Sequence, residues 1–192
     1  IIAKGITYLP EDMMDVIKRF DEAVGRVKEK GDEYTVNEGI KEAVRAIHET
    51  MSDQAFYDLM EVLVNRMLED GEVVAPMVDV NNVMDTLDLD TLKKGETFSF
   101  DREVRLQLDL VMNNEGQKWV PLFTSEEERH RQPTANVALN VSIERILLNG
   151  LKGEDVEGVV INPFGESLMM PKDLLRITMD EYERTKKKVS LN

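Results

Sequence analysis

Two separated stretches of the sequence constrain the fold more than any other feature. Residues 118–128 form an apolar run that passes directly into a capping box made by Ser125 and Glu128. Residues 158–161, Gly-Val-Val-Ile, form a second apolar run that is followed by Asn-Pro-Phe-Gly. The second run lacks alternation, which is typical of a strand covered on both faces. The chain between the runs is long enough for a helical crossover, so we predict two parallel strands in a β-α-β unit.

The neighbouring segments add a hairpin and a helix to this unit. Residues 104–112 alternate between apolar and polar side chains, which predicts a strand with one buried face. A turn at 113–116 returns the chain into the strand of 117–123, as in a β-hairpin. Inside the crossover, the spacing of apolar residues over 137–148 predicts a helix that closes at Asn149-Gly150.

Further strands and helices flank this unit on both sides. Residues 73–78 form a short apolar run typical of a strand, in which Pro76 requires an edge position, a strand end or a bulge. Residues 167–170 predict a short edge strand, and a last helix begins at Asp173. Upstream, Ser52 is the expected N-cap of a helix. The apolar face of that helix consists of Phe56, Leu59, Met60, Leu63 and Met67.

Two narrow apolar stripes with helical spacing precede Ser52. The first consists of Met13, Ile17, Phe20, Val24 and Val27, and the second of Ile40, Val44, Ile47 and Met51. The second stripe follows a capping box of Thr35 and Glu38. Helices of this length are marginal alone in water, so we expect them to pack against the domain or against another copy. The methionines on these faces favour core packing, with a groove for a partner helix as the alternative.

Together these patterns predict an α+β fold. It contains a mixed sheet of about five strands, a β-α-β crossover and flanking helices, preceded by an N-terminal helical extension. We divide the chain into the extension at residues 1–51, the α+β domain at 52–178, and the end of the last helix with a solvated tail at 179–192.

The net negative charge of the chain limits the classes of partner that we expect it to bind. It has 24 Lys and Arg against 38 Asp and Glu, a formal net charge of −14. Such a chain does not neutralise a phosphate backbone, so no nucleic-acid partner is expected. Its apolar runs are far shorter than a membrane span, and it has no cysteine for disulfides, iron–sulfur clusters or Cys-type zinc sites. We expect a cytoplasmic protein with no membrane partner.

No arrangement of catalytic or metal-ligating residues stands out. The two histidines, His48 and His130, have no spacing that predicts a shared role. The acids from Asp85 onwards do not form a calcium loop, because Lys93 occupies the position that needs glycine. Ser167 lacks the second glycine of a nucleophile elbow. We therefore predict no catalytic residue, no cofactor and no bound metal.

Polar and aromatic side chains gather where the two expected parallel strands end. Thr124 and Ser125 follow the first strand, and Asn162, Phe164 and Gly165 follow the second. Ligands of parallel sheets bind in crevices at the C-terminal ends of strands, so these five residues form the predicted crevice for a ligand or partner. The alternative is structural: Ser125 only caps, Asn162 only bonds the turn and Phe164 only packs.

The charge beside the predicted crevice limits what it would bind. Glu126, Glu127 and Glu128 occupy the first turn of the expected helix, where they compensate the helix dipole. A phosphate group would meet these like charges. We therefore expect a neutral or cationic ligand, such as a peptide segment or a basic protein surface.

The two signature stretches resemble a bacterial family. The run from Val120 to Glu128, the run from Gly158 to Gly165 and the sequence Pro171-Lys-Asp-Leu-Leu175 are similar to the SseB N-terminal domain, over about residues 52–178. In that family a strand ending in Phe-Thr-Ser leads into a helix, and a later strand ends in Asn-Pro. The family is linked by name to enhanced serine sensitivity. The resemblance implies no agreed reaction and supplies no catalytic residues.

From these observations we expect a cytoplasmic, non-catalytic binding module of the SseB type. Its partner would be a protein or a small neutral or cationic ligand. The alternative is an enzyme or metabolite-sensing domain that uses the crevice between the Phe-Thr-Ser and Asn-Pro-Phe-Gly loops. A homo-oligomer assembled through the N-terminal helices is a third expectation.

Overall fold

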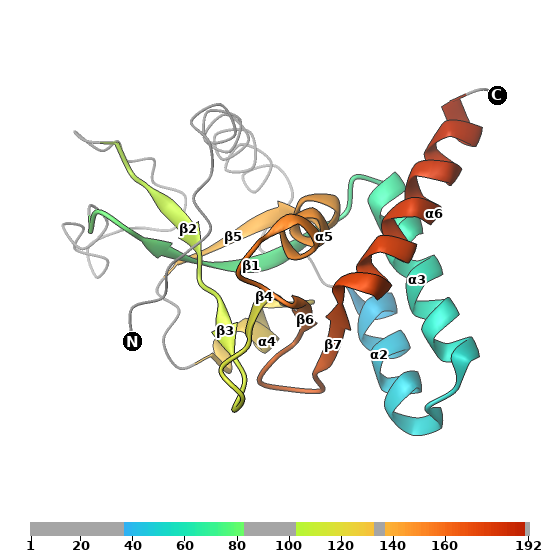
Figure 1. Cartoon of the computed structure of the whole chain (residues 1–192), viewed down its shortest axis with the longest axis horizontal. Helices are drawn as coiled ribbons and strands as arrows, with labels where there is room; N and C mark the ends of the chain where they lie inside the picture. The colour runs from blue at the N-terminus through green and yellow to red at the C-terminus, as the bar shows by residue number, and fades with distance from the viewer. Residues whose placement is uncertain (1–36, 83–102, 133–136, 191–192) are drawn as a thin grey trace.

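The computed structural model describes residues 37–82, 103–132 and 137–190 (Figure 1). The helices are α2 (Glu38–Thr50), α3 (Asp53–Leu68), α4 (Glu126–His130), α5 (Ile143–Lys152) and α6 (Lys172–Ser190). The strands are β1 (Glu72–Asp79), β2 (Leu106–Leu108), β3 (Val111–Met112), β4 (Lys118–Leu122), β5 (Val137–Ser142), β6 (Gly158–Ile161) and β7 (Leu168–Pro171). This mixture confirms the α+β class.

The described strands form two sheets rather than the single sheet of about five strands that the sequence predicted. One is a three-stranded antiparallel sheet in the order β2-β1-β5, and the other is a four-stranded mixed sheet in the order β3-β4-β6-β7. An antiparallel bridge between Val74 and Phe123 joins them, with backbone hydrogen bonds of 3.0 and 2.9 Å. The expected parallel pairing is confirmed, since Val120 lies opposite Val159 and Leu122 opposite Ile161.

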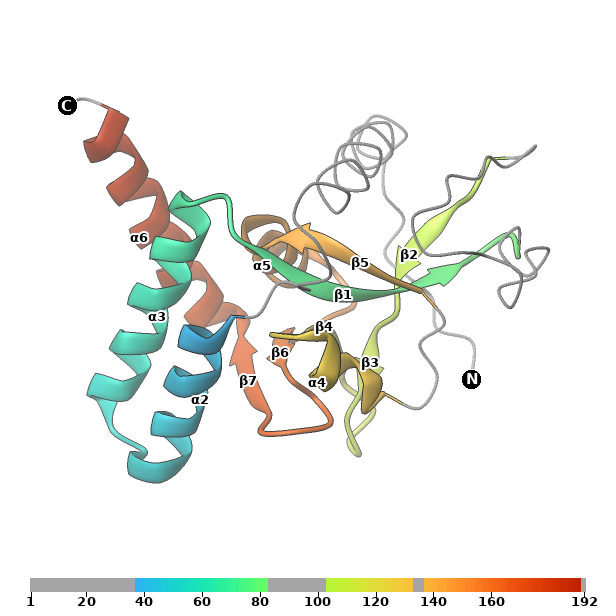
Figure 2. The same ribbon diagram turned by 180° about the vertical axis from the view of Figure 1, so that it is seen from behind.

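Three helices lie side by side at one end of the molecule. Figures 1 and 2 show α2, α3 and α6 as this helical layer, with α5 between α6 and the sheets. Ser52 caps α3 as predicted, accepting a hydrogen bond from the backbone N–H of Ala55 at 3.2 Å. Three residues of the second predicted stripe, Ile40, Val44 and Ile47, are buried in the same hydrophobic core as α3, α5 and the inner faces of both sheets. The fourth, Met51, follows the end of α2 and is exposed. The first expected helix, which carries the stripe from Met13 to Val27, lies outside the described residues.

The segment that precedes α5 differs from its prediction. Residues 137–142 form strand β5 beside β1, and the helix begins only at Ile143, with Ser142 accepting a hydrogen bond from the backbone N–H of Arg145. The crossover between β4 and β6 therefore contributes strand β5 to the three-stranded sheet. Gly150 does not end the helix, which continues to Lys152. It lies against Val159, where a Cβ atom would collide with that side chain.

The alternating stretch at 104–112 is also divided. It forms β2 in one sheet and β3 in the other, and the chain passes between the sheets at Asp109 and Leu110. Asp109 donates its backbone N–H to the carbonyl oxygen of Pro76 at 3.0 Å. Pro76 lies in β1 between the bridge at Val74 and the pairing with β2, so its missing N–H falls where β1 changes neighbours.

The structure differs from the sequence prediction at both ends of the described chain. Asn37 is the N-cap of α2 without a side-chain cap bond, whereas the predicted capping residue Thr35 lies outside the described residues. The last helix, expected to end within residues 179–192 and to be followed there by a solvated tail, continues to Ser190. Tyr182 of this helix is buried and donates its hydroxyl to Glu144 of α5 at 3.1 Å. The second half of α6 therefore belongs to the folded structure.

Candidate functional site

Thr124 and Asn162 of the predicted crevice bond to each other. The Asn162 Oδ1 accepts hydrogen bonds from the backbone N–H of Thr124 at 2.9 Å and from its hydroxyl at 3.2 Å. The Asn162 Nδ2 donates back to the Thr124 Oγ1 at 3.0 Å. Both side chains are 1% exposed, and Asn162 has the left-handed φ of 46° that asparagine tolerates. The pair fastens the ends of the two parallel strands, which is a structural use of these polar groups.

Hydrogen bonds around Thr124 also connect the start of α2 to the sheets. The backbone N–H of Asn37 donates to the Thr124 carbonyl at 3.0 Å, and its Nδ2 donates to the Glu72 carbonyl at 2.9 Å. Arg66 of α3 donates from Nε to the Asn37 Oδ1 at 3.2 Å. Buried polar groups are costly unless they are paired. These bonds therefore satisfy the polar groups around Thr124.

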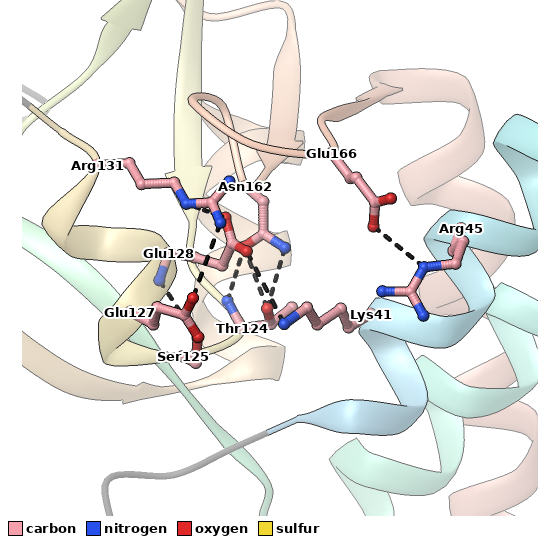
Figure 3. Close-up of polar contacts among 9 residues, drawn as sticks. All are labelled: Lys41, Arg45, Thr124, Ser125, Glu127, Glu128, Arg131, Asn162 and Glu166. Carbon is pink, nitrogen blue, oxygen red and sulfur yellow. Dashed lines mark hydrogen bonds and ion pairs between the residues drawn. The ribbon is translucent and has the colours of Figure 1, made fainter.

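Ser125 and Gly165 pack around a buried glutamate. Ser125 accepts a hydrogen bond from the backbone N–H of Glu128 at 3.3 Å and thereby caps α4. Figure 3 shows the Glu128 side chain between α2 and the turn after β6, with Lys41 4.0 Å and Arg131 3.6 Å from its oxygens. A Cβ atom on Gly165 would collide with the Glu128 carboxylate. The capping prediction for Ser125 is confirmed, and Gly165 makes room for Glu128.

Helix α2 also holds the turn that follows β6. Arg45 lies 3.4 Å from Glu166, and the His48 Nε2 is 2.9 Å from the carbonyl oxygen of Ser167 (Figure 3 shows the first pair). Phe164 of this turn stacks on Phe123, with ring centroids 6.5 Å apart, yet it remains 43% exposed. Phe164 is therefore exposed on a turn that α2 contacts.

A groove lies on the outer face of the four-stranded sheet. By register, Val111, Trp119, Val160 and Met169 share this face, whereas Val120, Val159 and Met170 face the core and the helices. The groove has a volume of about 270 Å³. We call it the sheet groove, and it is lined by Asp109, Leu110, Val111, Met112, Asn113, Trp119, Gln132, Val160, Pro163, Phe164, Ser167 and Met169.

The rim of the sheet groove is apolar, and some polar atoms of the groove residues have no hydrogen-bond partner. Met112, Phe164 and Met169 are all exposed on it, at 52%, 43% and 47%. The Trp119 Nε1 and the Gln132 Oε1 are buried and have no hydrogen-bond partner among the described residues. Buried polar atoms of this kind call for an explanation, because most such atoms in native proteins are paired.

Asp109 is the ionisable side chain of the sheet groove. Its carboxylate accepts a hydrogen bond from the Gln132 Nε2 at 2.9 Å. Burial raises the pKa of Asp109, and the hydrogen bond from Gln132 offsets part of this rise. The carboxylate is thus only partly stabilised by its surroundings in the described chain, which is a common property of functional carboxylates.

Of the five residues of the predicted crevice, Phe164 lines the sheet groove. The other four are not among its lining residues: Thr124, Ser125, Asn162 and Gly165. Asp109, Trp119 and Gln132 were not predicted as site residues from the sequence. These three come from a strand junction, from β4 and from the loop after α4. The lone tryptophan of the chain was a signal that could have pointed to this face.

Within the described residues, no group of three or more His, Asp or Glu side chains is placed to hold a metal ion. His48 contacts Ser167 and His130 contacts the carbonyl oxygen of Glu126, so the two histidines serve different elements. No helix in the described segments is long and apolar enough to cross a membrane.

Comparison with known proteins identifies the family. The model of the SseB protein N-terminal domain matches residues 40–176, more than half of the chain. The match begins inside the segment that the sequence analysis assigned to an N-terminal extension. No significant match is found among curated proteins or among solved structures. The chain belongs to the SseB N-terminal domain family.

Proposed function

We propose that this protein is a non-catalytic binding module that holds a peptide segment of a partner protein in the sheet groove. The observation that carries the proposal is the combination of an exposed apolar rim with a buried, unpaired donor and acceptor, the Trp119 Nε1 and the Gln132 Oε1. A peptide backbone offers one acceptor and one donor per residue, and its side chains supply apolar contact.

The structural role of the predicted crevice supports the same conclusion. Thr124 and Asn162 hydrogen-bond to each other and are buried, so their polar groups are not exposed to a substrate. The groove volume of about 270 Å³ lies just under the usual range for small-molecule sites, roughly 300–1,000 Å³. That size suits a few residues of a peptide lying across the sheet.

A random peptide library displayed on phage tests the proposal. The purified protein should select apolar peptides, and Met112→Gln or Met169→Gln should weaken their binding roughly tenfold each, because a buried methionine contributes about 1.5–3 kcal/mol. Met51→Gln is the matched control, since Met51 is 73% exposed at the end of α2 and lies outside the groove. Affinities are measured by isothermal titration calorimetry.

Two results would count against this function. One is a selection that yields no peptide above background. The other is a set of peptides whose affinity falls with Met51→Gln and not with the two groove variants, which would move the binding surface to the helical layer.

An enzyme or metabolite-sensing domain remains the second candidate, because burial raises the pKa of Asp109 inside a groove. A panel of ester, phosphate and peptide substrates addresses it. Turnover that Asp109→Asn abolishes and Asp155→Asn leaves intact would establish the enzyme and refute the binding module.

A further inference from the structure

We propose that the sheet groove recognises a Lys or Arg side chain of the partner peptide, with apolar residues on either side of it. This inference rests on the proposed function and specifies the chemistry of its ligand. It starts from the charge of the groove: among the residues that line it, Asp109 is the only one with an ionisable side chain.

The surroundings of Asp109 leave room for a cation. The carboxylate accepts a hydrogen bond from the Gln132 Nε2 at 2.9 Å, and it makes no ion pair with a described Lys or Arg. The Gln132 Oε1, which is buried and unpaired, adds a second acceptor beside this carboxylate. An ammonium or guanidinium group carries only donors, so it complements two neighbouring acceptors better than a neutral or anionic side chain does.

The apolar and aromatic part of the groove suits the rest of a basic residue. Lys and Arg bury their methylene stems on apolar surface, and aromatic rings such as Trp119 and Phe164 attract cations. The Trp119 Nε1 offers a hydrogen-bond donor to a carbonyl oxygen of a peptide backbone. A free amine has no such carbonyl oxygen. Met112 and Met169 on the rim would contact the flanking residues.

The charge of the whole chain points the same way. A protein with a formal net charge of −14 attracts basic partners and repels acidic ones over distances of about a Debye length, roughly 10 Å at 0.1 M salt. Long-range attraction of this kind does not select a site. The single carboxylate in the groove does, and the two contributions are separable by mutation.

The test uses three synthetic pentapeptides, Ac-Ala-Leu-Xaa-Leu-Ala-amide, in which Xaa is Lys, norleucine or Glu. Norleucine keeps the stem of Lys without its ammonium group. Binding is followed through the indole N–H signal in a ¹⁵N correlation spectrum, since Trp119 is the one tryptophan in the sequence. We expect the Lys peptide to bind at least about tenfold more tightly than the norleucine peptide, as for a charged hydrogen bond of about 1.5–3 kcal/mol, and the Glu peptide to bind most weakly.

Two variants separate local from long-range charge. Asp109→Asn should remove the preference for Lys over norleucine and leave the norleucine affinity within about twofold, because a near-isosteric change keeps the apolar contacts. Asp155→Asn removes the same unit of charge from an exposed site outside the groove and should leave the preference intact. The dispersion of the same spectra reports whether each variant is folded.

Four outcomes would overturn the inference. The first is equal binding of the three peptides, and the second is a Lys preference that survives in Asp109→Asn. Both leave the proposed peptide-binding function standing. The third is binding of N-acetyl-lysine amide as tight as that of the Lys peptide, which would replace the peptide with a small amine. Absence of binding by all three peptides also refutes the inference, and the library selection then decides the proposed function separately.

Discussion

At the scale of single residues, the Thr124–Asn162 pair and the buried polar groups of the sheet groove have opposite roles. Asn162 is buried and uses both amide atoms on Thr124. Trp119 and Gln132 are also buried, and each leaves a polar atom unpaired among the described residues. An unpaired buried group costs about 1–3 kcal/mol, so folding alone does not account for the second set. A ligand that pairs with these atoms would account for it.

The structural role of Asn162 can be measured. Asn162→Ala removes the bonds to Thr124 and leaves alanine at a φ of 46°, so we expect the free energy of unfolding to fall by about 2–4 kcal/mol. Asn82→Ala is the matched control: Asn82 has a φ of 53° but is exposed, and about 1 kcal/mol is expected there. Urea denaturation gives both values. Equal losses would mean that the Thr124 bonds contribute nothing.

Asp109 predicts a stability that depends on pH. Its folded pKa is raised by burial above the ordinary 3.8, so the ionised carboxylate destabilises the fold at all pH values above the folded pKa. That cost disappears as the pH falls from the folded pKa towards 3.8, because the folded protein takes up its proton first.

Asp109→Asn should therefore stabilise the protein at pH 7, and its advantage over the wild type should shrink as the pH falls towards 3.8. Urea denaturation of both proteins between pH 7 and pH 4 measures this difference, with Asp155→Asn as the control for loss of one exposed charge. An advantage that stays constant or grows towards acid pH would contradict the raised pKa. A carboxylate that costs stability is expected to have a function.

At the scale of elements, sequence patterns predicted what local interactions determine. The capped helix after Ser52, the strand at Val73 and the parallel pair β4 and β6 all follow from capping, periodicity and apolar runs. The segment 137–142 was assigned to a helix because its apolar spacing continues into α5. Its alternation of Val137, Leu139 and Val141 equally fits a strand, and pairing with β1 decides between them.

The division of the strands into two sheets had no local signal. Nothing in the alternation of 104–112 marks Asp109 as the point where the chain leaves one sheet, because that depends on the distant Pro76 and Val74. The candidate site could not be predicted for the same reason. The sheet groove combines residues from a strand junction, four strands and three connecting loops, whereas the predicted crevice followed from a general rule about parallel strands.

The packing of α5 on β6 gives a prediction at this scale. Gly150→Ala places a Cβ atom against the Val159 side chain and 3.1 Å from the Gly158 carbonyl carbon, so we expect destabilisation of about 1–3 kcal/mol despite the better helix propensity of alanine. Gly39→Ala in α2 meets its nearest atom at 3.5 Å and should stabilise by about 0.5–1 kcal/mol. Thermal unfolding compares the two. A stabilising Gly150→Ala would show that α5 is packed more loosely.

At the scale of the whole molecule, the two faces of the four-stranded sheet have different uses. One face packs on α5 and α6 and contributes to the core, and the other carries the sheet groove. Helix α2, through Arg45 and His48, holds the turn that presents Phe164 to that groove. We therefore propose that the helical layer stabilises the four-stranded sheet and that a partner binds at the sheet groove.

A chemical-shift map of the ¹⁵N-labelled protein with a peptide selected from the library tests this division most directly. The account predicts that the Trp119 indole signal, the Gln132 side-chain amide and the backbone amides of Met112 and Met169 change on binding. Signals from the exposed side of α2 and α3 should stay where they are. Changes centred on the helical layer, with the Trp119 indole signal unmoved, would contradict the claim that the sheet groove is the binding site.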